Sequence, residues 1–260
     1  MKKMIQPTFL DNTLSFSLPD SWEKLSQEQL RYVLFALRTF DDVQAKTYLF
    51  IRLLGIRVLE KTEAGWLCRI RLSFFRKQKF FIQEWQVRYY LQKLDFINEP
   101  GFVPVRFEKV GKYHAVDSQL HNVMFNDYIR LENYYQGFLA CKDETLLLSM
   151  WKLLYRDEKG QYADALRLDQ VQLLSVVIWF SAVKNLFSGK FPSFFQKVGD
   201  NFGEEQAPDM ETVMNAEIRA LTGGDVTKER DVLEMDCWRA LTELNEKARE
   251  AQEFNEKYGR

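Results

Sequence analysis

The stretch VQLLSVVIWFSAVKNLF, residues Val171–Phe187, decides the fold class of this chain. Its apolar residues leave no continuous polar face, which indicates a helix inside a protein or a membrane. The run is shorter than the roughly 20 residues of a membrane span, because Asp169 and Lys184 interrupt it. Val176–Ile178 are β-branched and favour a strand, but buried strands rarely exceed about 8 residues. We therefore expect a central buried helix around which the amphipathic segments pack.

Composition limits the class of protein further. The 260 residues fit one or two domains, and an apolar share of 46% supports a real core. The net charge of −1 favours neither nucleic acid nor an acidic membrane as a partner. Cys68, Cys141 and Cys237 stand far apart, which is typical of small buried side chains in a reducing compartment. No apolar stretch follows the two N-terminal lysines, so we expect no signal peptide and a cytoplasmic location.

The N-terminal residues predict an extended start and a helical hairpin. Residues Thr13–Leu18 alternate with period two, as a half-buried strand does. Ser26 with Gln29 matches a capping box that begins one helix. A second helix runs from Asp41 to a stop at Gly55. Two helices with a short joint form a hairpin.

A small β element is expected after this hairpin. Two strand-like segments, residues 57–61 and 66–72, predict a β-hairpin. In the second segment Arg69 and Arg71 share the face opposite to the apolar side chains. A short helix over residues 84–94 comes next.

The second half of the chain is mainly helical, and we expect its last part to be separable. The domains predicted are a mixed, mainly helical domain over residues 1–198, an acidic linker over 199–209 and a helical tail over 210–260. The fold class predicted is therefore α+β, mainly α, with an N-terminal helical hairpin, a small β element, a central buried helix and a C-terminal helical tail. We expect that deleting Asp225–Arg260 leaves residues 1–198 folded.

Few residues suggest chemistry. His114 and His121 are the only histidines and have no cysteine nearby, so they do not match a zinc site. Gly223-Gly224-Asp225 lacks the Lys-Ser or Lys-Thr of a phosphate-binding loop, and a helix stop explains it. No nucleophile elbow occurs. We expect no catalytic residues, no metal and no cofactor, and predict that the protein is not an enzyme.

Charge is distributed unevenly. Between Arg52 and Lys93 lie ten basic and three acidic residues, interleaved with aromatic ones. This pattern suits single-stranded nucleic acid, and the candidate residues are Arg69, Arg71, Arg76, Lys77 and Lys79. The alternative is a hairpin with buried aromatic side chains and solvated basic ones. Residues 200–236 carry eleven acids and three bases, so opposite patches could also dock within one chain or between copies.

A short C-terminal pattern resembles the end of some tail assembly chaperones of long-tailed phages. It consists of the helix end Glu217–Gly224 followed by Val232–Leu241, where Val-Leu-x-Met precedes an aromatic residue and a leucine-rich helix. Ser21–Leu30 is similar to segments of prophage proteins of unknown function. The resemblance covers about 40 of the 260 residues. It implies a non-enzymatic protein of virion assembly that acts through protein partners.

The leading hypothesis is therefore a phage or prophage assembly protein, a scaffold or chaperone that binds other structural proteins of a virion, or itself, in the host cytoplasm or the virion. The candidate partner-binding residues are Trp238, Leu241, Leu244 and Ala248, which form one face of the last helix. Packing of this face against the body of the same chain is the alternative. The second hypothesis is a nucleic-acid-binding module that uses the basic residues named above. We expect neither a membrane nor a small-molecule substrate.

Overall fold

The computed structural model describes residues 8–10, 13–71, 73, 76–164, 167–195 and 210–258. The chain forms two compact units, Met1–Gly101 and Phe102–Arg260. Helices dominate, accompanied by small antiparallel sheets, so the predicted mainly helical α+β class is confirmed. The linker expected at residues 199–209 lies outside the described residues, and the domain boundary placed there stays a prediction.

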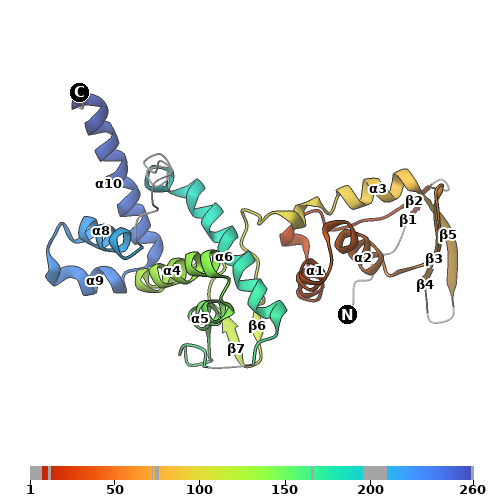
Figure 1. Ribbon diagram of the computed structural model, residues 1–260, viewed down its shortest axis with the longest axis horizontal. Helices are drawn as coiled ribbons and strands as arrows, with labels where there is room; N and C mark the ends of the chain where they lie inside the picture. Colours follow the sequence, from red (N-terminus) through yellow and green to blue (C-terminus); the bar gives the residue numbers. More distant parts are fainter. Residues whose placement is uncertain are drawn as a thin grey trace. The chain divides into compact units, whose positions relative to one another are not determined.

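In the N-terminal unit the second helix of a helical hairpin and one further helix pack against a three-stranded sheet (Figure 1). Its elements are β1 (Thr8–Leu10), β2 (Thr13–Ser15), a 3-10 helix (Trp22–Lys24), α1 (Gln27–Thr39), α2 (Asp42–Leu54), β3 (Ile56–Thr62), β4 (Gly65–Arg71), β5 (Lys77–Gln83), α3 (Glu84–Gln92) and a 3-10 helix (Asp95–Asn98). The third strand, β5, was not predicted.

Local signals fix the helical hairpin as expected. The Ser26 hydroxyl accepts the Gln29 backbone N–H, and the Gln29 side chain accepts the Ser26 backbone N–H, which completes the capping box of α1. Asp41 caps α2, and Gly55 ends it with φ of 63°. The buried Phe50 ring on α2 stacks on Tyr90 with ring centroids 5.8 Å apart, and this contact joins α2 to α3.

The sheet β3–β4–β5 has one covered face and one open face. Cys68, Ile70 and Ile82 are buried on the face toward α2 and α3. The strands approach closely at Gly65, where a Cβ atom would lie 2.1 Å from the Ile82 carbonyl oxygen. We call the opposite side of this sheet the outer face.

The C-terminal unit is a group of helices with a second small sheet (Figure 1). Its elements are β6 (Lys109–Val110), β7 (Tyr113–Ala115), α4 (Phe125–Cys141), α5 (Glu144–Leu154), β8 (Tyr155–Arg156), α6 (Gln170–Lys190), α8 (Met210–Thr222), a 3-10 helix, η3 (Val226–Lys228), α9 (Glu229–Glu234) and α10 (Cys237–Tyr258). Helix α4 packs on α5, and α5 packs on α6. Helix α8 packs on α9 and α10, and α9 and α10 also pack on α4.

The apolar stretch of the sequence forms α6, which is buried on one side. Val176, Phe180 and Phe187 have almost no exposed surface, whereas Leu174 and Ile178 are half-buried. Within the described ranges α6 is the one helix long and apolar enough to cross a membrane by length and composition. Its packing against α5 accounts for part of that apolar character.

The C-terminal helices belong to the core of their unit, which corrects the expectation of a detachable tail. The Cys237 backbone N–H donates to the Val123 carbonyl oxygen at 2.8 Å, and the Phe125 N–H donates to Met235 at 2.7 Å. The start of α10 is thereby tied to the start of α4. Along α10, Cys237 and Leu241 are fully buried.

One carboxylate in this unit makes stability depend on pH. Burial, and then the neighbouring Glu132 carboxylate, raise the pKa of Glu217 on α8 to about 7, although Lys184 lowers it. The folded protein therefore holds a proton that the unfolded chain loses above about pH 4.5, and stability falls as pH rises from about 4.5 to 7. Each unit of such a shift is worth about 1.4 kcal/mol, and Glu217 is partly solvated.

We accordingly expect native protein to lose about 2 kcal/mol of unfolding free energy between pH 5 and pH 8 through this group. Glu217→Gln should remove that part of the pH dependence, and it should be the more stable protein at pH 8. Urea unfolding of both proteins at the two pH values measures the difference. Parallel pH profiles would show that Glu217 ionises in the fold at no cost.

Candidate functional site

The outer face of β3–β4–β5 gathers basic side chains in two rows. In the first row Arg57 on β3 lies opposite Arg69 on β4, which lies opposite Lys79 on β5. In the second row Arg71 lies opposite Lys77. We call these five residues the basic rows. Alternation along the strands places all five on the outer face, and they are exposed apart from the half-buried Arg69.

The basic rows are electrostatically unfavourable in the protein alone. Side chains directly opposite on neighbouring strands have Cβ atoms about 5 Å apart, and like charges at that distance destabilise the pair. In water two unit charges about 5 Å apart repel by about 0.8 kcal/mol. Arg57, Arg69 and Lys79 make no ion pair with any described residue. One acidic residue, Glu60, lies on the same face, because it pairs with Leu67 in the strand register.

Apolar side chains continue the outer face next to the basic rows. Phe81 on β5 lies opposite Leu67 on β4 and keeps 47% of its surface exposed. Leu59, at a register shift in β3, is also exposed. Trp85, at the start of α3, keeps 63% of its surface exposed, and its indole N–H donates to the Gln83 side-chain oxygen. The face therefore combines cations with uncovered rings.

The structure brings together four of the five basic residues predicted from the sequence, namely Arg69, Arg71, Lys77 and Lys79. Arg76 lies in the connection before β5, and its backbone N–H donates to the Ser73 hydroxyl. Sequence reasoning did not assign Arg57 to the site, because its neighbours are set by the strand register. The other interpretation of this segment, aromatic side chains buried and basic ones solvated, holds for Trp66 and Tyr90 but not for Phe81.

The predicted partner-binding residues are occupied within their own unit. Leu241, Leu244 and Ala248 are buried, with 0%, 4% and 9% of their surface exposed. The half-buried Trp238 donates its indole N–H to the Gln119 carbonyl oxygen at 2.7 Å. Its ring stacks on His121, with ring centroids 4.5 Å apart. Packing of this face against the body, the alternative weighed from the sequence, is what the structure has.

The C-terminal pattern that resembles phage tail assembly chaperones, Glu217–Gly224 and Val232–Leu241, contributes to the same packing. Val232 is buried, the Met235 carbonyl oxygen accepts from Phe125, and an Asp236 carboxylate oxygen accepts the Asn122 backbone N–H at 2.6 Å. The Gly223-Gly224 pair ends α8 with φ of 63° and 85°, so the predicted helix stop is confirmed.

Beyond the buried region α10 carries two exposed rings. Phe254 and Tyr258 lie one helical turn apart, with ring centroids 5.0 Å apart, and are 62% and 63% exposed. These two rings form the outer end of α10, which runs past α8 in Figure 1. This end is the part of the predicted interaction helix that its own unit leaves uncovered.

No catalytic or metal-binding arrangement is found among the residues that the structure describes. No group of three or more His, Cys, Asp or Glu side chains there could hold a metal ion. His114 is exposed on β7, and His121 is held against Trp238. The thiols of Cys68 and Cys237 are buried, and burial raises the pKa of Cys68 to about 11, which makes it a poor nucleophile.

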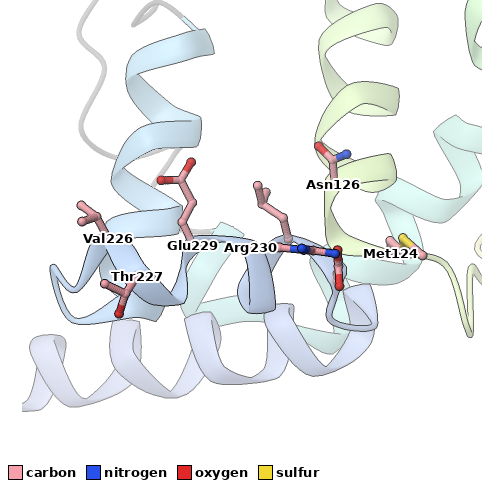
Figure 2. A pocket seen from close by; sticks show the side chains of 8 residues that line it. Met124, Asn126, Val226, Thr227, Glu229 and Arg230 are labelled. Atoms are coloured by element: carbon pink, nitrogen blue, oxygen red, sulfur yellow. The ribbon is translucent and has the colours of Figure 1, made fainter.

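A surface hollow of about 510 Å³ lies between α4, η3 and α9. Figure 2 shows Met124 and Asn126 on one side, Val226 and Thr227 on the other, and Glu229 and Arg230 between them. Arg230 pairs with Glu234 at 2.8 Å, and the Thr227 hydroxyl donates to Asp225. Three of the polar side chains of the hollow are thus engaged with their own neighbours.

Comparisons with known proteins found no matching family model, no matching curated protein and no matching solved structure.

Proposed function

We propose that the protein binds nucleic acid through the outer face of β3–β4–β5. The observation that carries the proposal is the first basic row, in which Arg57, Arg69 and Lys79 stand side by side without a counterion from the described residues. A chain of phosphates supplies negative charge and would relieve the repulsion within this row. Arginine and lysine are the side chains that contact phosphate most often.

Two simpler explanations of the basic rows account for fewer of their residues. Lysines on an edge strand such as β5 protect it from pairing with other chains, but Arg69 and Arg71 lie on the central strand. Docking of the acidic C-terminal segment would also compensate the charge. Two of its acids already have partners nearby, since Asp225 pairs with Lys228 and Glu234 pairs with Arg230.

Charge reversal at Lys79 tests the proposal. Lys79→Glu would place a carboxylate opposite Arg69, so we expect at least a tenfold loss of affinity for a labelled oligonucleotide without a loss of thermal stability. The affinity of native protein should fall as the salt concentration rises. The slope of log affinity against log salt concentration should be about −2 for three phosphate contacts and about −3.5 for five. Fluorescence anisotropy at several salt concentrations measures both quantities.

The matched control is Lys109→Glu on β6, an exposed residue of the other unit, which changes the net charge equally. Its affinity should stay within about twofold of native protein if binding depends on the basic rows themselves and not on the net charge. Equal losses in both variants, or binding that ignores salt, would rule out the basic rows as the site.

We propose virion assembly through protein partners as the second candidate function, in line with the resemblance of the C-terminal motif. The observation that favours it is the exposed outer end of α10, where the rings of Phe254 and Tyr258 lie against each other and are left uncovered. In either function the protein acts in the host cytoplasm, and the free thiols of Cys68, Cys141 and Cys237 support a reducing compartment.

A further inference from the structure

On the outer face, the side chains of the edge strand β5 form a strip that changes from basic to aromatic along the strand. Lys77, Lys79, Phe81 and Gln83 alternate with inward-facing residues, so they follow one another at steps of about 6.6 Å. Lysines occupy the first two positions of the strip, and the ring of Phe81 occupies the third. Among the described strands β5 pairs with β4 alone, so it forms an edge of the sheet.

Trp85 extends this strip beyond the end of the strand. The hydrogen bond from its indole N–H to the side chain of Gln83, the last residue of the strip, ties the ring to the end of β5. Other large rings of this unit, such as Phe50, Trp66 and Tyr90, are buried in its core. Phe81 and Trp85 stay uncovered, with 47% and 63% of their surfaces exposed.

Cations and rings in one line fit one class of ligand best. An apolar protein surface over the rings would also have to desolvate Lys79, two residues from Phe81, and an unpaired buried charge is costly. A duplex offers phosphates to the lysines, but its bases stack within the helix and give the rings no faces to contact. An unpaired strand offers both phosphates and free base faces.

We infer that the site is specific for single-stranded nucleic acid, with phosphates on the basic rows and bases stacked on Phe81 and Trp85. This inference rests on the proposed function. It adds that the rings, and not only the charges, contribute to affinity. The sequence of the strand matters little, because every base has a face that can stack.

The test uses the full-length protein with three labelled probes of equal length: a thymidine oligonucleotide, a uridine oligonucleotide and a DNA duplex. The variants are Phe81→Leu and Trp85→Leu, exposed sites where the fold should tolerate the change. We expect each variant to lose about fivefold or more in affinity for a single strand and to bind the duplex as native protein does. A loss of affinity for either single-stranded probe supports the inference. Which probe is affected shows whether the site binds DNA or RNA.

Phe102→Leu is the matched control, because it removes an exposed ring, 71% exposed, that belongs to neither candidate site. Binding of a single strand should also quench tryptophan fluorescence in native protein but not in Trp85→Leu. If native protein binds duplex as tightly as single strands and both ring variants bind normally, this inference fails. The proposed function survives that outcome if Lys79→Glu still loses affinity, and both fail if it does not.

Discussion

Deleting Asp225–Arg260 should unfold the C-terminal unit. This result is the opposite of what the sequence suggested, because the heptad-like stripe of α10 is buried against its own unit. The deletion removes five buried side chains of α10, namely Cys237, Ala240, Leu241, Leu244 and Ala248. It also leaves Phe187 and Phe191 without the Trp238 ring, which lies 5.2 and 5.5 Å from them.

The free energy lost with these side chains is comparable to the stability of a whole domain. Burying one large apolar side chain contributes about 1.5–3 kcal/mol, and the leucines, Cys237 and Trp238 together approach the 5–15 kcal/mol that stabilises a typical domain. The N-terminal unit contains none of these residues. Circular dichroism melting should therefore show a transition for the N-terminal unit and the loss of the cooperative transition of the C-terminal unit.

A shorter deletion is the matched control. Removing Ala251–Arg260 takes away the exposed end of α10 and leaves Ala248 in place, so the melting temperature should change by only a few degrees. If the second candidate function holds, this variant should also lose self-association, or capture of a protein partner, in light scattering. Retention of a cooperative C-terminal transition in the longer deletion would show that α10 is dispensable for folding.

Local signals allowed most of the helices to be predicted. Ser26 with Gln29, and Asp41 with Gly55, mark helix ends through bonds within four residues, and the structure places them as expected. The β-hairpin followed from alternation in β4, where apolar and basic side chains take opposite faces. Such features depend on neighbours in the sequence, and one sequence is enough to see them.

Features set by distant contacts could not be predicted in the same way. The strand β5, with the sequence KQKFFIQ, has two adjacent phenylalanines that obscure its alternation. Arg57 joins the basic rows only through its register with Arg69, and the shift at Leu59 then changes the pairing of the rest of β3. An apolar stripe such as that of α10 looks the same whether its own unit or a partner covers it. For that reason the sequence left the role of Leu241 open.

Replacing Asp127 by alanine should cost about 3–5 kcal/mol of unfolding free energy. Its side chain on α4 is 2% exposed and accepts hydrogen bonds from the Arg156 guanidinium at 3.0 Å and the Tyr162 hydroxyl at 2.9 Å. Arg156 is itself 19% exposed, and burial lowers its pKa while Asp127 raises it. Without the carboxylate, a mostly buried cation loses the one acid that pairs with it among the described residues.

The double variant Asp127→Ala with Arg156→Met separates the ion pair from simple packing. Because it removes both charges, it should recover part of the stability that Asp127→Ala loses. The surface control is Glu234→Ala, which breaks the exposed pair with Arg230 and should cost less than about 1 kcal/mol. Urea unfolding of native protein, Asp127→Ala, Arg156→Met and the double variant completes the cycle, and Glu234→Ala is measured beside them. A cost for Asp127→Ala no larger than that for Glu234→Ala would mean that water replaces the carboxylate, and that the link between α4 and β8 contributes little to the fold.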